Sequence, residues 1–315
     1  MAARVRRDPN TIDFPFFKTI VTGSRPRRTK FTLNPIWTKN KAKLIEKYLF
    51  QFVFITHHGT YIDGFAGPQR PSNPEMWAAK LVLESRPRWL RNFYFFDIEK
   101  KQIALLDKLV ESQPPPDKSK KEPKRTTSVK HGDGNLLIIE LLKSKKIREN
   151  EATFCLLDQR NIECEWSTLV ALSSYKKHGN KIEILYFLPS AWLNRALKNR
   201  KDKSLIKKWW GREDWKQMES MASFNRVELF KDRFKKELGY SSVEAWPIFA
   251  NNSRSRIMYY MIHATDHPAA PILMQRAYRK AVGPPESPGE VQLDIETLLK
   301  TSVCSPFESG PNFVH

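Results

Sequence analysis

The chain has 315 residues, 40% of them hydrophobic, which is enough for one large α/β domain or for a domain with an appendage. It contains no stretch of about 18 consecutive apolar residues, so no membrane span is expected. No apolar segment follows Arg4, Arg6 and Arg7, so we expect a cytoplasmic protein rather than a secreted one. Three scattered cysteines suit neither a disulfide framework nor a zinc site.

The formal net charge is +20, and +15 of it falls in three segments, residues 1–30, 113–128 and 195–216. This concentration favours a polyanionic partner, above all nucleic acid. The alternative is a set of solvated surface segments that only aid solubility.

The order of the expected elements begins with a basic, proline-rich arm over residues 1–34, which should be irregular. A helix is expected over 35–54, because apolar residues recur there at helical spacing and Asn34 is a good N-cap. Strands and helices then alternate. The expected strands cover 59–63, 92–97, 128–130, 153–158 and 181–188, and the expected helices cover 75–84, 100–110, 135–142 and 167–175.

The C-terminal third changes character. A basic helical insertion is expected over 189–240, including a helix at 227–238. Strands at 243–250 and 256–265 should pair antiparallel because the connection between them is short. A helix over 267–281 and a tail over 283–315 follow.

We therefore predict an α/β, doubly wound, Rossmann-like fold with a mostly parallel sheet and a C-terminal antiparallel hairpin. This is the architecture of class I methyltransferases. The predicted parts are the arm 1–34, the cofactor-binding core 35–188, the insertion 189–240, the hairpin and helix 241–282, and the tail 283–315.

The turn after the first core strand is the most informative motif. Asp63 ends the strand, and Gly64, Phe65 and Gly67 follow in the sequence DGFAG. Glycines let the backbone turn sharply and approach a ligand, and ligands of doubly wound sheets bind at the carboxyl ends of the strands. The alternative is a tight turn without a ligand.

Acidic residues also end the next two strands. Asp97 could accept hydrogen bonds from ribose hydroxyls, and Asp133, which follows Gly132, could bind an adenine amino group. Each could instead cap the helix that follows it.

The fourth strand ends in Asp158-Gln159-Arg160-Asn161. In a methyltransferase of this fold, Asp158 and Arg160 would face the methyl group and its acceptor, which makes them the catalytic candidates. The fixed charge of Arg160 suits an anionic substrate. The alternative is a surface ion pair of Arg160 with an acidic residue.

Cations and aromatics alternate in the insertion. Lys207, Lys208, Trp209, Trp210 and Arg212 could bind nucleic acid, with cations on phosphates and indoles on unpaired bases. The alternative, which we favour for most of the tryptophans, is an amphipathic helix that buries them.

Histidine does not indicate a metal site. His263 and His267 flank Asp266 at an expected strand end, where core or capping roles fit better.

Several motifs together resemble the three-Cys-motif partner (TcmP) family, over roughly residues 35–281. They are Trp37-Thr38-Lys39 with Lys41, YIDGFAGP at 61–68, Phe96-Asp97, Gly132–Asn135, Asp158 with Glu165-Trp166, Tyr259-Tyr260 and His267-Pro268. The resemblance implies a methyltransferase-like fold, S-adenosyl-L-methionine as cofactor, and a partner protein with a three-cysteine, radical-SAM-like motif. Two motifs depart from the family: Gln69 replaces a glycine, and Asp-Gln-Arg-Asn replaces Asp-Pro-aromatic-Gly.

Three functions compete. The first is an S-adenosyl-L-methionine-dependent methyltransferase acting on nucleic acid or another anionic substrate. The second is a non-catalytic subunit that binds nucleic acid or docks a partner. A dinucleotide-dependent oxidoreductase is weaker, because GxGxxG spacing is missing. The first requires Asp63, Asp97, Asp133 and Asp158 to converge on one rim.

Overall fold

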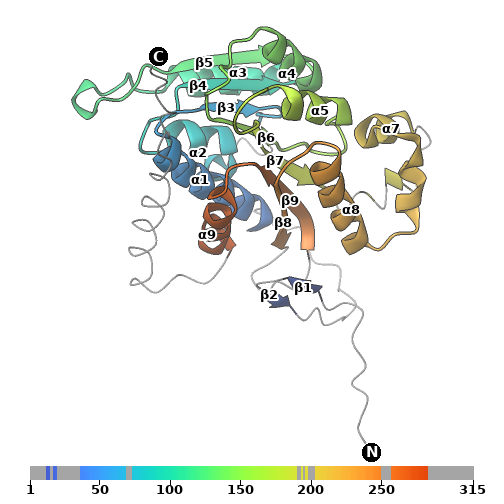
Figure 1. Cartoon of the computed structure of the whole chain (residues 1–315). Coiled ribbons are helices and arrows are strands. Elements are labelled where there is room, and N and C mark those ends of the chain that lie inside the picture. Colours follow the sequence, from blue (N-terminus) through green and yellow to red (C-terminus); the bar gives the residue numbers. More distant parts are fainter. Residues whose placement is uncertain are drawn as a thin grey trace, which may run out of the picture.

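The computed structural model describes residues 12–14, 17–19, 36–68, 73–189, 193, 196–197, 203–249 and 257–282. Its centre is a seven-stranded sheet with helices on both faces (Figure 1). The strands are β3 (Thr60–Asp63), β4 (Asn92–Asp97), β5 (Thr126–His131), β6 (Thr153–Leu157), β7 (Glu183–Leu188), β8 (Ser242–Phe249) and β9 (Ile257–Thr265).

The helices precede, connect and follow these strands. They are α1 (Ile36–Thr56), α2 (Ala78–Glu84), α3 (Lys100–Glu111), α4 (Gly134–Lys143), α5 (Trp166–Ser174), α7 (Ser204–Trp210), α8 (Ser223–Lys236) and α9 (Ala270–Val282), with short 3₁₀ helices η1 (Pro74–Met76), η2 (Lys118–Lys120) and η3 (Glu213–Glu219).

The strand order is β5-β4-β3-β6-β7-β9-β8. The strands from β3 to β7 are parallel, whereas β9 runs antiparallel to both β7 and β8. The chain moves outward from β3 to β5 and then returns to the other side of β3, so the order reverses there. The predicted doubly wound fold with a terminal antiparallel hairpin is confirmed.

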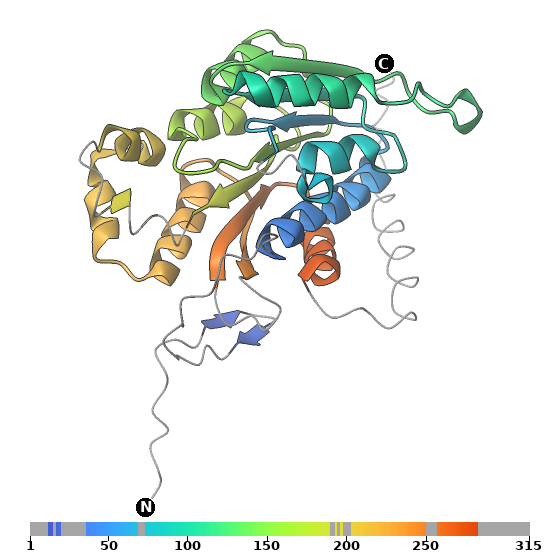
Figure 2. The same cartoon turned by 180° about the vertical axis from the view of Figure 1, so that it is seen from behind.

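Two hydrophobic clusters cover the two faces of the sheet. Successive strand side chains point to opposite faces, so Phe93 and Phe95 of β4 join the helices α1, α2, α3 and α9, whereas Tyr94 and Phe96 join α4, α5 and α8. Seen from behind, α1 and α9 lie side by side on one face (Figure 2). This burial on both faces explains why β4 is an uninterrupted aromatic run.

Some expected elements differ from the structure. The helix expected over 75–84 is divided into η1 and α2, and the strand expected over 128–130 extends to Thr126–His131. Within the arm that we expected to be irregular, β1 (Ile12–Phe14) and β2 (Phe17–Thr19) form a separate antiparallel pair. Local proline content signals turns well but does not exclude the short strands between them.

Within the described ranges, no helix combines the length and apolarity needed to cross a bilayer. The same residues contain no cluster of three or more His, Cys, Asp or Glu side chains arranged to hold a metal ion.

Candidate functional site

The four acidic residues follow four neighbouring strands at the carboxyl edge of the sheet. Asp63 pairs in register with Phe95 of β4 and Leu156 of β6, so Asp97 and Asp158 lie just beyond it on either side. Asp133 follows β5, which pairs with β4. The expected convergence on one rim is therefore present, at the point where the strand order reverses.

Main-chain hydrogen bonds fix the turn after β3 to both neighbouring strands. The Gly64 N–H donates to the Leu156 carbonyl at 3.1 Å, and the Ala66 N–H donates to the Phe96 carbonyl at 2.8 Å. The Gly67 N–H donates to Asp97 Oδ2 at 2.9 Å. A Cβ atom at Gly67 would lie 2.4 Å from that oxygen, so only glycine allows this approach.

Asp63 is the most deeply buried acid of the rim, 2% exposed. Its carboxylate accepts hydrogen bonds from the Phe65 N–H at 3.1 Å and from the Tyr61 hydroxyl at 3.2 Å. Burial raises the pKa of Asp63 to about 8, and the nearby Asp158 carboxylate adds to the rise. Asp63 is therefore mostly protonated at pH 7 and fixes the turn through the Phe65 N–H, and a direct contact with a cofactor stays a prediction.

Asp97 lies under the side chain of Arg160. Besides the bond from Gly67, it accepts a hydrogen bond from the Glu99 N–H at 2.8 Å. Arg160 reaches from beyond β6 to donate to Glu99 Oε1 at 2.6 Å, and its Nη2 lies 4.0 Å from Asp97 Oδ2. The alternative that Arg160 pairs with an acidic residue is thus confirmed, and its partners include a cofactor-binding candidate.

Asp133 caps α4. Its Oδ1 accepts hydrogen bonds from the Asn135 main chain at 2.8 Å and from the Asn135 side chain at 3.0 Å. The capping alternative is confirmed, and an additional contact with adenine stays a prediction. Gly132 precedes it and donates its N–H to the Asp97 carbonyl at 3.0 Å. These bonds hold the β4 and β5 ends together.

Asp158 forms an ion pair that sequence reasoning missed. Lys41 of α1 contacts both carboxylate oxygens, at 2.8 and 2.7 Å, and its side chain is only 4% exposed. The ammonium group also lies over the rings of Phe187 and Tyr259, at 5.5 and 5.7 Å from their centroids. The sequence did contain a sign of this pair, because Lys41 stands on the apolar face of the helix, three residues before Leu44. A lysine at such a position needs a buried partner.

Gln159 is fully buried and holds the loop after β6. Its Nε2 donates to the Phe187 carbonyl at 2.9 Å, and its Oε1 accepts from the N–H groups of Glu163 and Cys164. The non-family residue at this position therefore has a structural role. The other departure, Gln69, lies outside the described residues.

A small cavity lies beside the turn after β3. The cavity beside Gly67 measures about 20 Å³ and is bordered by Lys41, Trp77 and Asp158. Trp77 donates its Nε1–H to the Ala66 carbonyl at 2.8 Å and so lies against the turn. A cavity for S-adenosyl-L-methionine requires several hundred Å³, so Trp77, which lines this one, must move before such a molecule can enter it.

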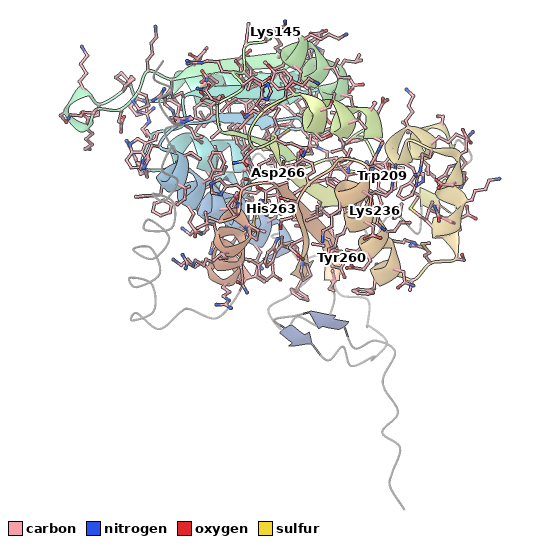
Figure 3. The ribbon with its side chains drawn as sticks, viewed as in Figure 1. Lys145, Trp209, Lys236, Tyr260, His263 and Asp266 are labelled. Atoms are coloured by element: carbon pink, nitrogen blue, oxygen red, sulfur yellow. The ribbon has the colours of Figure 1, made fainter. Side chains whose placement is uncertain are left out.

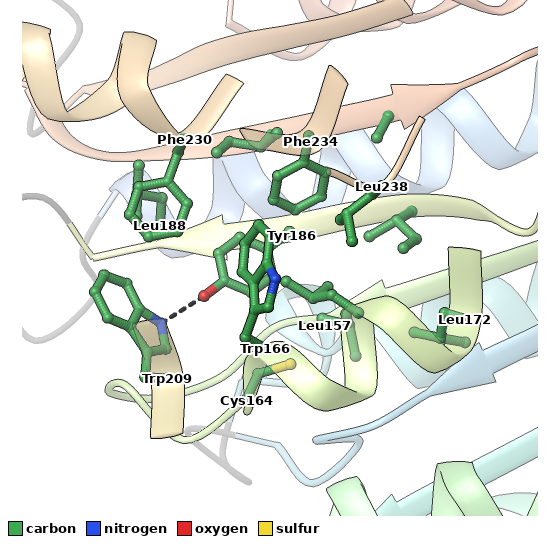
Figure 4. Close-up of a cluster of buried hydrophobic side chains, with 14 of the residues drawn as sticks. Leu157, Cys164, Trp166, Leu172, Tyr186, Leu188, Trp209, Phe230, Phe234 and Leu238 are labelled. Carbon is green, nitrogen blue, oxygen red and sulfur yellow. Dashed lines mark hydrogen bonds between the residues drawn. The ribbon is translucent and has the colours of Figure 1, made fainter. Parts of the chain in front are cut away.

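The tryptophans of the insertion that lie within the described residues pack inward. Trp209 and Trp210 are 1% and 0% exposed, and Trp209 donates to the Tyr186 hydroxyl (Figure 4). The prediction that these two indoles stack on bases is therefore wrong, because neither has a free ring face, and the buried alternative is confirmed. Lysine and tryptophan alternate on a helix whether its indoles face solvent or the core, so the pattern did not distinguish the two.

The cationic candidates of the insertion lie at the surface in ion pairs. Lys207 contacts Glu213 at 2.8 Å, and Lys208 contacts Glu165 at 3.2 Å. Arg212 contacts Glu237 at 3.1 Å. All three are exposed enough to exchange these partners for phosphates at small cost.

A buried arginine fastens the insertion to the core. The Arg233 guanidinium lies between the rings of Trp166 and Trp210, 3.6 and 4.0 Å from their centroids. It also donates to the Trp210 carbonyl at 2.6 Å and to both carboxylate oxygens of Glu237 at 2.7 Å. This residue had no role in the sequence-based predictions.

The chain is similar in fold to several solved structures. Neither a protein-family model nor a curated protein matches the sequence. Trm1 from Pyrococcus horikoshii, a complex with S-adenosyl-L-methionine, is 13% identical with a TM-score of 0.40, covering 77% of this chain. The chain spans 58% of that Trm1 chain.

Two further structures are similar at the same level. Human methyltransferase-like protein 13, in complex with SAH, is 11% identical with a TM-score of 0.38, covering 82% of this chain and 98% of its own. The Legionella pneumophila protein LPL1258 is 10% identical with a TM-score of 0.40, covering 77% and 93%. The fold of this chain is assigned from its own strand order.

Proposed function

We propose that the rim of β3, β4, β5 and β6 binds S-adenosyl-L-methionine and that the protein is a methyltransferase. The observation that carries this proposal is the direct hydrogen bond from the glycine turn at Gly67 to Asp97, at the point where the strand order reverses. It joins the two features that a doubly wound sheet uses for a nucleoside: a close-approaching backbone and a carboxylate at the end of the next strand.

The polar groups beside this hydrogen bond suit a nucleoside ligand. Arg160 Nη2 and Gln102 Oε1 are buried atoms without a hydrogen bond among the described residues. A bound polar molecule that displaces Arg160 from this place could donate to Gln102 Oε1, since buried acceptors are normally paired. The fit requires Arg160 to leave Glu99, which costs little because both side chains are at least one-third exposed.

Each residue would then have a separate task. Asp97 would accept hydrogen bonds from the ribose hydroxyls, and Asp133 lies at the neighbouring strand end for the adenine. Asp158, oriented by Lys41, would position the acceptor. The cofactor supplies an activated methyl group, so the protein's contribution is to hold the two reactants in line and to exclude water.

Calorimetric titration of the full chain with S-adenosyl-L-methionine and S-adenosylhomocysteine tests this proposal. Asp97→Ala should abolish binding. Arg160→Ala should strengthen it by up to about fivefold, the equivalent of one exposed ion pair. Asp107→Ala, an exposed residue of α3, serves as the control and should leave the affinity unchanged. No binding at millimolar concentration by either the wild type or Arg160→Ala would refute the proposal.

The acceptor that we propose is nucleic acid. The net charge of +20 and the exposed cations Lys207, Lys208 and Arg212 support a polyanion. Binding of single-stranded RNA should weaken steeply as salt is raised, and Lys207→Ala with Lys208→Ala should reduce that slope. An affinity that is independent of salt would exclude a phosphate-based contact.

A second candidate is a non-catalytic subunit that docks nucleic acid or a three-Cys-motif, radical-SAM-like partner. The cavity of about 20 Å³ beside Gly67 favours it, because this space is far too small for a cofactor while Trp77 lies against the turn. Salt-sensitive RNA binding without any cofactor binding would support this alternative.

A further inference from the structure

A second cavity, of about 470 Å³, opens at the other edge of the sheet, where β6 and β7 begin and β9 ends. None of the four rim acids lines it. Its size falls within the range of about 300–1,000 Å³ that is usual for small-molecule sites. α1 connects the two regions, because Lys41 lies at the rim and Phe52 in the cavity wall, about 16 Å apart along the helix axis.

One wall of this cavity is apolar. Phe52 and Ile55 of α1 face Ala270 and Leu273 of α9, and these two helices pack against each other. Such a wall suits the body of a small aliphatic or aromatic molecule.

The floor of the cavity is a satisfied polar network. Glu183 accepts hydrogen bonds from the Tyr48 hydroxyl, from His263 Nε2 at 2.8 Å and from the Thr265 hydroxyl at 3.1 Å. Figure 3 labels His263 on β9 and Asp266 just beyond the strand. The core role expected for His263 is thereby confirmed, and Glu183 has no further need of a ligand.

Glu151, on the polar wall, is different. It is 6% exposed, and its Oε1 has no hydrogen bond among the described residues. The closest ionisable partner is His58, whose Nδ1 lies 3.6 Å away and also has no hydrogen bond. That distance exceeds a hydrogen bond, so the carboxylate is buried beside a cavity without a donor, which is costly unless something else supplies one.

The neighbouring lysine does not supply that donor. Lys176 is 8% exposed, and its ammonium group donates to the main-chain carbonyl of Glu151 rather than to the carboxylate. Burial lowers the pKa of Lys176 to about 8, against the opposing effect of Glu151 and Glu149. The amine is therefore already engaged, and Glu151, which lines the cavity, keeps an unpaired carboxylate oxygen.

We infer that this cavity binds a small molecule that carries a protonated amine on an apolar body. The ammonium group pairs with the Glu151 carboxylate beside His58, and the body lies on Phe52, Ile55 and Leu273. An ammonium has three donors and no acceptor, which matches the unpaired carboxylate oxygen of Glu151. A metal ion does not suit the place, since the described residues offer no third ligand.

The test uses three probes that share a phenylethyl body on the full chain without cofactor. They are 2-phenylethylamine, 2-phenylethanol and 3-phenylpropionate, compared by ligand-observed NMR titration. The amine should bind at least tenfold more tightly than the alcohol, and the carboxylate should not bind. Equal affinities, or no saturation by the amine at 10 mM, would overturn the inference; a probe of about nine heavy atoms that fills the site should bind below that concentration.

Two variants locate the binding. Glu151→Gln keeps the side-chain shape and removes the charge, so the amine should bind at least tenfold more weakly. Glu140→Gln, an exposed residue 3.9 Å from Lys130, should bind the amine as the wild type does. An unchanged affinity in Glu151→Gln would refute the assignment.

A second readout does not depend on Glu151→Gln folding normally. In protein labelled in its histidine rings, the His58 resonance, identified through His58→Gln, should shift as the amine is added. A shift confined to other histidines would place the amine elsewhere. Because cofactor is absent throughout, failure of this inference leaves the methyltransferase proposal untouched, and the reverse also holds.

Discussion

Lys41 and Asp158 are 117 residues apart in sequence and form a two-pronged ion pair at the carboxyl edge of the sheet, with Nζ 2.8 and 2.7 Å from the two carboxylate oxygens. The pair joins α1 to the residue directly after β6. Because the lysine is buried beneath two aromatic rings, Asp158 cannot turn away without leaving a cation in an apolar place.

Removal of this lysine should therefore destabilise the fold. Lys41→Met leaves Asp158 without its partner, and we expect the free energy of unfolding in urea to fall by about 2–4 kcal/mol. Lys41→Met combined with Asp158→Asn should recover part of the loss, because no unpaired charge is left. The control is Lys80→Met, which breaks a surface pair with Glu84 and should cost less than about 1 kcal/mol.

The protonation of Asp63 should make stability depend on pH in the direction opposite to most carboxylates. Its pKa is about 8 when folded, above the unfolded value, so the native state binds the extra proton between these values. The stabilisation of the folded state by the protonated Asp63 carboxyl is thus fully present below about pH 4. It is lost as pH rises through about 8.

Asp63→Asn removes the fall in unfolding free energy that ionisation of Asp63 causes at high pH. Relative to the wild type, the variant should gain at least about 1 kcal/mol of unfolding free energy between pH 5 and pH 8.5, as measured by urea denaturation at both values. Any constant effect of the amide on the hydrogen bonds cancels in this difference. An identical pH dependence of the two proteins would show that Asp63 is ionised in the folded state.

Gly134 should tolerate no side chain. A Cβ atom there would lie 2.2 Å from the carbonyl oxygen of Gly64, which is main chain and cannot swing away. Gly134→Ala should cost about 2 kcal/mol or more, since α4 must move off the turn after β3. Thermal denaturation measures this loss, which should lower the melting temperature by more than about 1–2 °C. A melting temperature within about 1–2 °C of the wild type would contradict the close contact between Gly134 and Gly64.

Arg233 should be the residue that ties the insertion to the core. Arg233→Lys keeps the charge but loses the flat contact with Trp166 and Trp210 and the paired bonds to Glu237. Amide hydrogen exchange should accelerate at least tenfold in α7 and α8 while the amides of β3 and β4 keep their protection. Lys236→Met, which breaks an exposed pair with Asp232, should change neither region.

The sheet and its rim could be predicted because they depend on local signals. β3, β4 and β6 are short apolar runs that end in, or are directly followed by, an acidic residue, and parallel strands carry those ends to one edge whatever the loops do. The aromatic run from Asn92 to Asp97 predicted both ends of β4 correctly. The two strands within the N-terminal arm lacked such a signal, since each has only three residues.

The contacts at the rim could not be predicted in the same way. Asp158 and Lys41 are adjacent only because α1 crosses the sheet, and Arg160 meets Glu99 only because the strand order brings β6 and β4 to either side of β3. The buried state of Trp209 depends on Tyr186 and on the aromatic residues of α8. The amino-acid sequence shows which side chains are apolar, but the partner of each side chain depends on how the strands and helices pack.

The ion pair between Arg160 and Glu99 has an unusual consequence for ionic strength. A molecule that needs Arg160 to swing aside competes with a bond that salt weakens, so its apparent affinity should increase as salt is added. A polyanion on the same protein loses affinity under the same conditions. Cofactor and nucleic acid would thus respond in opposite directions to one variable, and buffers that favour one would conceal the other.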